Sequence, residues 1–195
     1  MTGSVQAFVF KNRGALLAVP AVALTAFGKP SALSVTLGLP LAIAGELVRC
    51  WAVGYSGVTT RGNEVTAPEL VTAGPYAYVR NPLYAGNFVT AAGFAIAFTG
   101  RNSPLARLAL VAGSLAAMAG VYATIVPHEE GFLRSQFGEA FDAYCAEVPP
   151  VIPRLEPAGG GRGTWRPSVI KEAESRTFAT FGAMLAALAL KALKA

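Results

Sequence analysis

Residues 83–126 read LYAGNFVTAAGFAIAFTGRNSPLARLALVAGSLAAMAGVYATIV, two long apolar runs around one short polar turn. The runs at 83–99 and 105–126 approach or exceed the roughly 20 residues that a helix needs to cross a hydrocarbon core. Between them, Ser103 can cap the second helix, and Pro104 suits its first turn. This stretch therefore predicts a helical hairpin that spans a membrane.

Three further apolar stretches extend the pattern to most of the chain. Of its 195 residues, 53% are hydrophobic and only 14% are charged, a balance that would make a soluble domain of this size hard to keep dispersed. The additional spans are predicted at residues 15–27, 33–53 and 177–193, and the first and last are short for a bilayer. We therefore expect an all-α fold, a multi-span transmembrane helical bundle of about five spans.

The first two spans are predicted to form another hairpin. Lys29, Pro30 and Ser31 make a tight polar turn between them, and Ser31 can cap the helix that follows. Lys11 and Arg13 precede the first span, as basic residues also precede the apolar part of a signal peptide. Because no convincing small-residue cleavage site follows, we expect a span that is retained.

The distribution of positive charge predicts the orientation of the bundle. The chain has a formal net charge of +5, and most basic residues lie near the N-terminus, in the polar loop at 54–75, at Arg80, and after the fourth span. The positive-inside rule places these segments in the cytoplasm. Attraction to anionic headgroups is sufficient to explain the excess charge, so we expect membrane lipids, and no nucleic acid, as partners.

Cysteine and histidine are too rare to suggest a metal site. Cys50 lies near the end of a predicted span and Cys145 lies in a cytoplasmic segment, so neither a disulfide framework nor a thiolate site is expected. His128 is the single histidine, and one histidine cannot form a His-rich zinc site. We therefore assign no metal.

Beyond the fourth span, the chain is predicted to lie at the membrane surface. Apolar residues recur there every three or four positions and indicate an amphipathic interfacial helix. They are Leu133, Phe137, Phe141, Tyr144 and Val148. The predicted domains are a membrane core at 1–155, a flexible linker at 156–167 and a C-terminal helix at 168–195, which is either a fifth span or an interfacial anchor; we favour the span.

Two polar stretches flank the central hairpin. Residues 70–86 read LVTAGPYAYVRNPLYAG, and residues 128–138 read HEEGFLRSQFG. Lipid does not favour tyrosine, arginine, asparagine and paired glutamates, so such groups at a helix boundary usually serve chemistry or bind a polar ligand. The alternative is an aromatic belt for the tyrosines, a solvated surface for the glutamates, and a phosphate or glutamate partner for Arg80.

One further pair of charges lies inside a predicted span. Glu46 and Arg49 are spaced i to i+3, so they lie on one face of the helix and can form an ion pair. A contact with a ligand is the other interpretation, because charged groups within spans are often functional.

Together, the two polar stretches resemble the isoprenylcysteine carboxyl methyltransferase family, which includes relatives of the phospholipid N-methyltransferases. The resemblance covers residues 70–153 and rests on two signatures in a fixed order, one on each side of the hairpin. The first signature is matched by Gly74, Tyr76, Arg80, Asn81, Pro82, Tyr84 and Gly86, and the second by Glu129, Glu130, Leu133, Phe137, Gly138, Tyr144, Val148, Pro149 and Pro153.

The resemblance implies an integral-membrane methyltransferase with a cytoplasmic pocket for S-adenosylmethionine. This cofactor combines a zwitterionic end, a sulfonium cation and an apolar adenine face, so its pocket needs carboxylate, aromatic and backbone polar groups. The residues expected to bind it are Leu70, Val71, Tyr76, Asn81, Pro82, Leu83, Tyr84, Gly86 and Glu129.

The family also implies in-line transfer of the methyl group to a lipophilic acceptor that enters from the bilayer. The protein then contributes alignment of the reactants and exclusion of water. The expected catalytic residues are Arg80, which would contact cofactor or substrate, and Glu130, which would act as a base if the acceptor is an amine. A carboxylate or thiolate acceptor needs no base.

Two positions depart from the eukaryotic members of that family. Asn81 replaces a histidine, so the side chain can still form hydrogen bonds but cannot titrate. Ile125 stands where those members have an arginine that is thought to meet the substrate carboxylate. The acceptor therefore stays open between a prenylcysteine-like carboxylate, a phospholipid amine and an apolar small molecule.

Two other classes of function remain as alternatives. One is a membrane reductase of related helical arrangement that uses a nicotinamide cofactor, although the sequence lacks the longer basic pocket that the extra phosphates would need. The other is a non-catalytic membrane scaffold. A scaffold predicts that replacing Glu129 or Tyr84 changes stability alone.

Overall fold

The computed structural model describes residues 2–57 and 66–194, so residues 58–65 of the predicted polar loop lie outside it. Within the described residues, helices are the regular elements and no strand is present. They are α1 (Thr2–Phe27), α2 (Ala32–Ser56), α3 (Pro82–Phe98), α4 (Pro104–Phe137), α5 (Glu139–Glu147) and α6 (Ile170–Leu193), with short 3-10 helices η2 (Gly74–Ala77) and η3 (Pro167–Val169).

Four of the described helical segments are long and apolar enough to cross a membrane, namely those in α1, α2, α4 and η3 with α6. The helix α3 is also apolar but has only 17 residues, which corresponds to about 25 Å of length. It therefore crosses a hydrocarbon core of about 30 Å only with flanking residues or local thinning of the bilayer. The prediction of an all-α membrane bundle is confirmed.

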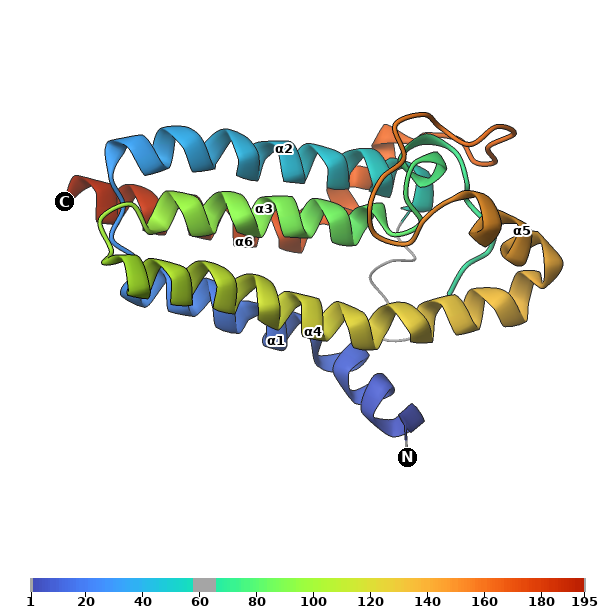
Figure 1. Cartoon of the computed structure of the whole chain (residues 1–195). Coiled ribbons are helices and arrows are strands. Elements are labelled where there is room, and N and C mark those ends of the chain that lie inside the picture. Colours follow the sequence, from blue (N-terminus) through green and yellow to red (C-terminus); the bar gives the residue numbers. More distant parts are fainter. Residues whose placement is uncertain (1, 58–65, 195) are drawn as a thin grey trace.

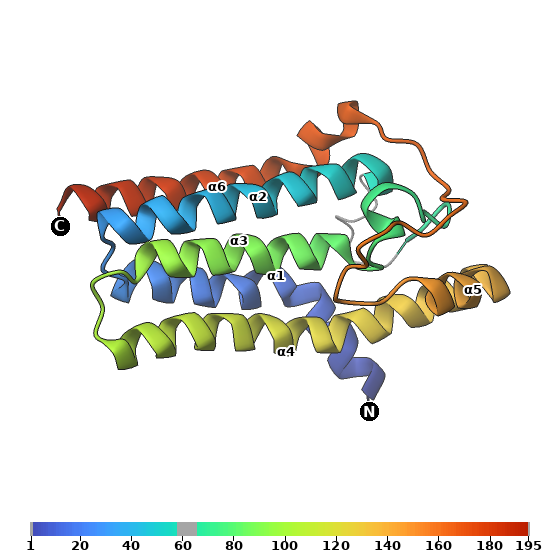
Figure 2. The same cartoon turned by 45° about the horizontal axis from the view of Figure 1, so that its top comes forward.

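The helices run back and forth along one bundle, with α2 beside both α3 and α6, and α1 beside α4 (Figure 1, Figure 2). The α1–α2 and α3–α4 turns and the C-terminus lie at one end. The segment before α3, the helix α5 and the chain that follows α5 gather at the opposite end. The two polar sequence stretches thus meet at one end of the bundle.

Several helix starts follow the residues that predicted them. The Ser31 hydroxyl accepts a hydrogen bond from the Ser34 amide at 3.1 Å, and the Ser34 hydroxyl accepts one from the Ser31 amide at 2.9 Å. The Ser103 hydroxyl accepts from the Ala106 amide at 3.4 Å. Pro82 begins α3, where its missing N–H leaves no donor without a partner.

Glycines bring α2 and α3 into backbone contact. A Cβ atom added at Gly93 would lie 2.3 Å from the Ala42 nitrogen, and one at Gly45 would lie 2.4 Å from the Thr90 nitrogen. Small residues at helix interfaces permit this close approach in membranes. The contact fixes α3, whose first turn carries Tyr84, against α2.

The structure differs from the sequence prediction where α4 ends. The helix continues beyond the predicted end at residue 126 and stops at Phe137. Gly138 then adopts φ of +52°, a conformation that glycine tolerates better than other residues. The predicted amphipathic helix is therefore divided, because Leu133 and Phe137 belong to α4 while the remaining apolar residues follow the break.

Residues 148–166, here called the strap, form backbone hydrogen bonds with the core. The Arg80 amide donates to the Pro149 carbonyl at 2.9 Å, and the Ala158 amide donates to the Ala77 carbonyl at 2.9 Å. Further bonds are Arg154 N to Tyr78 O, Thr72 N and Ala73 N to Arg162 O, and Arg166 N to Gly54 O, with lengths of 2.8–2.9 Å. The strap therefore lies against the segment that leads into α3.

Candidate functional site

The two polar stretches meet in a direct hydrogen bond. Tyr84 lies in the first turn of α3, and Glu129 lies in the C-terminal part of α4. The Tyr84 hydroxyl donates to Glu129 Oε1 at 2.7 Å. Residues 45 positions apart in the chain are thus brought together at one site.

Arg80 and Glu130 form a second link between the same segments. Arg80 Nε donates to Glu130 Oε1 at 2.9 Å, and Arg80 Nη2 donates to Glu130 Oε2 at 3.2 Å. Arg80 Nη1 also donates to the Val148 carbonyl at 2.7 Å, so the guanidinium joins the strap to α4. The side chains of the pair are 12% and 17% exposed. Such a forked pair fixes geometry as well as charge.

Asn81 and Tyr76 complete the polar end of the site. Asn81 Nδ2 donates to the Pro150 carbonyl at 3.1 Å, and the Tyr76 carbonyl accepts from the Tyr144 hydroxyl at 2.7 Å. Burial raises the pKa of Tyr76 to about 12 and also raises the pKa of Tyr144. Both phenols are therefore neutral at physiological pH and keep a proton to donate.

Gly74 explains how Tyr76 reaches this position. Its φ of +62° is favourable for glycine, and a Cβ atom there would lie 2.2 Å from the Tyr55 ring. The chain can therefore turn tightly against the end of α2 and continue into η2.

These side chains border a cavity of about 1220 Å³. It is lined by Leu70, Val71, Tyr76, Asn81, Pro82, Leu83, Tyr84 and Glu129, and by the predicted catalytic residues Arg80 and Glu130. Gly86 is not among the lining residues. It faces α2, where an added Cβ would lie 2.7 Å from Arg49 Cγ and 2.9 Å from the Gly45 carbonyl oxygen.

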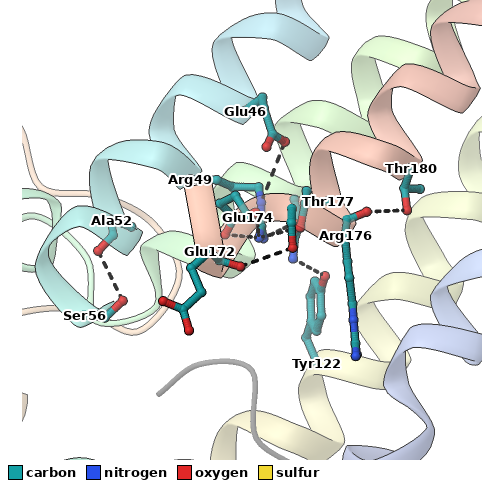
Figure 3. A network of polar contacts seen from close by, with 12 residues as sticks. Glu46, Arg49, Ala52, Ser56, Tyr122, Glu172, Glu174, Arg176, Thr177 and Thr180 are labelled. Carbon is teal, nitrogen blue, oxygen red and sulfur yellow. Dashed lines mark hydrogen bonds and ion pairs between the residues drawn. The ribbon is translucent and has the colours of Figure 1, made fainter. Parts of the chain in front are cut away.

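Deeper in the bundle, the cavity reaches a polar cluster that sequence reasoning did not identify as one site (Figure 3). The expected contact between Glu46 and Arg49 is present at 3.8 Å. Arg49 Nη2 also donates to both carboxylate oxygens of Glu174, each at 2.8 Å. Asn87 Nδ2 donates to the Tyr122 hydroxyl at 2.7 Å.

A weak sequence signal for this cluster did exist. Asn87 follows Tyr84 by three residues, and Tyr122 precedes Glu129 by seven, so each lies on the same helical face as a predicted site residue. Glu174 gave no such signal, because its partner Arg49 is 125 positions away.

Another part of the cavity wall is mostly apolar and lies between α1 and α6. It is lined by Ala18, Ala21, Val22, Thr25 and Ala26 from α1, and by Thr180, Ala183, Met184 and Ala187 from α6. The basic side chains of Lys11, Arg13, Arg166 and Arg176 border the cavity as well. One continuous space thus joins a polar end to an apolar groove, as a site for a polar and a lipophilic ligand requires.

Within the part of the chain that the structure describes, no three histidine, cysteine, aspartate or glutamate side chains gather closely enough to hold a metal ion.

Comparison with known proteins connects this geometry to a family. The family described as phospholipid methyltransferase has a model that matches residues 33–140. That range includes α2 from its second residue, all of α3 and α4, and both polar stretches. No solved structure gives a significant match to the chain.

Individual relatives carry the names of different kinds of protein. The cobalt-zinc-cadmium resistance protein CzcN of Cupriavidus metallidurans is 33% identical over 66% of this chain and 51% of its own length. The nickel-cobalt-cadmium resistance protein NccN of Alcaligenes xylosoxydans xylosoxydans is 37% identical over 61% of this chain and 48% of its own length. A probable protein-S-isoprenylcysteine O-methyltransferase of Oryza sativa subsp. japonica is 28% identical over 62% and 61%. The chain thus spans about half the length of the first two.

Proposed function

The chain belongs to the phospholipid methyltransferase family, and from that premise we propose that it is an integral-membrane methyltransferase. Its proposed reaction moves a methyl group from S-adenosylmethionine to a lipophilic acceptor. The observation that carries the proposal is the hydrogen bond between Tyr84 and Glu129, at the polar end of a cavity that continues into an apolar groove.

The residues at the polar end have the chemistry that this cofactor needs. Glu129 would accept hydrogen bonds from amino or ribose hydroxyl groups. Tyr76 and Tyr84 would present aromatic faces to the adenosine or to the sulfonium, where cation–π attraction contributes about 1 kcal/mol. Leu70, Val71, Pro82 and Leu83 would cover the apolar adenine face, and Asn81 would add a polar edge. When bound, S-adenosylmethionine supplies an electrophilic methyl group.

The size of the cavity supports binding of two ligands. Pockets for one small molecule commonly have volumes of about 300–1,000 Å³, whereas this cavity has about 1220 Å³. The walls formed by α1 and α6 would receive an apolar acceptor from the bilayer. In this arrangement the protein aligns the two reactants and excludes water, effects that together supply several kcal/mol.

Arg80 and Glu130 have two proposed roles. Because Arg80 joins the strap to α4, it would hold the entrance of the site in shape. Glu130 accepts hydrogen bonds from Arg80 and, at 3.5 Å, from Asn81. It would act as a base only for an amine acceptor, since an amine must lose a proton and a carboxylate or thiolate need not.

The proposed orientation places the polar end of the cavity in the cytoplasm. Lys11, Arg13, Arg166 and Arg176 all border the cavity. Basic residues favour the cytoplasmic side of a membrane. A soluble cofactor would then enter from the cytoplasm, and the acceptor would enter laterally. The acceptor classes remain a prenylcysteine-like carboxylate, a phospholipid amine and an apolar small molecule.

Transfer of a labelled methyl group tests the proposal directly. The full chain, purified in native lipid extract, is supplied with methyl-labelled S-adenosylmethionine, and the lipophilic products are identified by mass spectrometry. We expect one labelled product class, reduced strongly by Glu129→Gln and unchanged by Glu139→Gln, since Glu139 is exposed at the start of α5. Absence of labelled product, together with oxidation of a nicotinamide cofactor, would instead support the reductase.

A further inference from the structure

Arg49 has a position that the proposed reaction does not yet explain. Its side chain is 10% exposed and borders the cavity from α2. Nη2 donates to Glu174 and, at 3.3 Å, to Thr177, while Nη1 donates to Asn87 Oδ1. Figure 3 shows Glu46 and Glu174 on either side of the guanidinium. Since these partners occupy both terminal nitrogens, Arg49 is suited to position its neighbours and not to bind a ligand anion.

Glu174 comes from a helix outside the segment that the family model matches. That match ends at residue 140, whereas α6 begins at Ile170. The Glu174 side chain is only 1% exposed. Burying an ion pair costs desolvation energy that good geometry must offset, and the two 2.8 Å contacts provide such geometry. The helix α6 is thus joined to the family core through Arg49.

Arg49 determines which way the Asn87 amide points. A guanidinium can only donate hydrogen bonds, so the oxygen of the amide must face Arg49. The amide nitrogen then faces the Tyr122 hydroxyl and donates to it at 2.7 Å. The Tyr122 oxygen is therefore an acceptor in this contact, and its own proton is available for another bond.

Tyr122 presents that proton to the cavity. It is a lining residue, and within the residues that the structure describes no acceptor is found for its hydroxyl proton. Its ring is held by Tyr84, at a centroid distance of 4.3 Å, and by Phe88, at 5.4 Å. Tyr122 lies seven residues before Glu129 on α4, which places it about 10 Å further along the helix, toward the apolar groove.

We propose that Glu174 is a positioning residue, which acts through Arg49 and Asn87 to orient the Tyr122 hydroxyl as a hydrogen-bond donor toward the methyl acceptor. This inference rests on the proposed function, because it assigns the inner part of the same cavity to the acceptor. It requires the acceptor to carry an oxygen, nitrogen or sulfur atom that accepts a hydrogen bond there. A purely apolar acceptor is excluded.

Kinetics with paired variants test the role of this contact. Tyr122→Phe removes the hydroxyl and retains the ring, so we expect the lipid-extract concentration for half-maximal label transfer to rise about three- to tenfold. Affinity for S-adenosylmethionine, measured by calorimetry, should remain as in wild type. Glu174→Gln should produce the same change, and the double variant should be no worse than Tyr122→Phe alone. Glu172→Gln, on the exposed face of α6, is the control.

A merely structural role for Glu174 predicts a different result. In that case, Glu174→Gln would lower the melting temperature. It would either have no kinetic effect or have one that adds to the effect of Tyr122→Phe in the double variant. Unchanged half-maximal transfer in Tyr122→Phe would likewise overturn the proposal. Circular dichroism on each variant separates these outcomes from a failure to fold, and Glu174→Asp, which keeps the charge, should recover part of the loss.

A spectroscopic measurement tests the same inference without any turnover. The chain has six tyrosines, so ring-labelled ¹³C tyrosine in lipid nanodiscs gives a small set of signals, and Tyr122→Phe identifies the relevant one. That signal should move in Glu174→Gln and stay in Glu172→Gln. It should also move when sodium oleate is added, but not with octadecene, which lacks a hydrogen-bond acceptor. If oleate leaves it in place, the proposal is wrong, whether or not wild type transfers a methyl group. If only label transfer fails, the proposed function is wrong.

Discussion

The two sides of the bundle use small residues in opposite ways. Between α2 and α3, Gly45 and Gly93 bring the backbones so close that no Cβ atom fits. Between α1 and α6, alanines such as Ala21 and Ala183 border the cavity instead. The difference teaches that small side chains give close packing only where two helices face each other directly. Elsewhere they leave a space between the helices.

The two helix pairs carry different parts of the candidate site. The α2–α3 contact holds Tyr84 and Arg49 in fixed positions, because α3 and α2 carry them. The α1–α6 side provides the apolar groove, and α6 is joined to α2 through Glu174. The close packing of α2 with α3 and the cavity wall between α1 and α6 can therefore be tested with separate mutations.

The largest effect is expected from disrupting the close packing of α2 against α3. Gly93→Leu would force a side chain into the Ala42 nitrogen and the Gly38 carbonyl oxygen, 2.3 and 2.7 Å from the added Cβ. Both are backbone atoms and cannot rotate away, so we expect destabilisation of more than about 3 kcal/mol. Thermal unfolding in detergent should show a large drop in melting temperature. Gly113→Leu on α4, where an added Cβ meets nothing within 4 Å, should melt as wild type does.

A smaller effect is expected from Arg80, at the polar end of the cavity. Arg80→Gln leaves Glu130 without its forked partner and releases the Val148 carbonyl. Breaking a mostly buried pair costs about 3 kcal/mol, and the strap should loosen from α4. Hydrogen exchange of residues 148–154 should accelerate in this variant. Arg154→Gln is a suitable comparison, because among the described residues its exposed side chain donates only to the Glu147 carbonyl. Equal exchange in both variants would contradict the role given to Arg80.

Sequence patterns predicted the parts of this fold that depend on local chemistry. Ser31 and Ser103 cap helices as expected, and Pro82 starts α3. The family resemblance assigned Tyr84 and Glu129 to one pocket, and the two side chains are in contact. Such features depend on neighbours in the chain or on one antiparallel turn.

Other features depend on distant contacts and could not be predicted in the same way. In the sequence, Glu174 is one of several charged residues at the start of an apolar helix. Only the packing of α6 against α2 shows that it is buried beside Arg49. Gly86 belonged to the matched signature, so it was grouped with the cofactor residues. Its place on the α2 side of α3 follows from helix rotation, which a motif does not specify.

A third prediction concerns the cavity wall between α1 and α6. Ala183→Phe should fill part of the groove on α6 and raise the lipid-extract concentration for half-maximal transfer several-fold, while stability changes little. Ala186→Phe is the control, since Ala186 is exposed on α6 but is not a lining residue. If both variants behave alike, the groove between α1 and α6 is not the route of the acceptor.

The smallest effect is expected from pH. Burial holds the pKa of Tyr76 at about 12, whereas an unfolded tyrosine titrates near 10. The neutral form is therefore favoured in the folded state, so its contribution to stability is complete below about pH 10 and is lost as the pH rises toward 12. Between pH 7 and 9, titration of Tyr76 should not change the free energy of unfolding. Tyr76→Phe should reduce the loss of stability above pH 10. If the free energy of unfolding falls with pH equally steeply in the variant and in wild type, the burial of Tyr76 is contradicted.

The central claim is that the segment before α3 and the C-terminal part of α4 form one S-adenosylmethionine site. Isothermal titration calorimetry on the full chain in nanodiscs tests it most directly. We predict saturable binding to wild type and to Glu139→Gln, and binding at least about tenfold weaker to Glu129→Gln, because a hydrogen bond to a charged group contributes about 1.5–3 kcal/mol. No binding to the folded wild type, or equal affinity in Glu129→Gln, would contradict the claim.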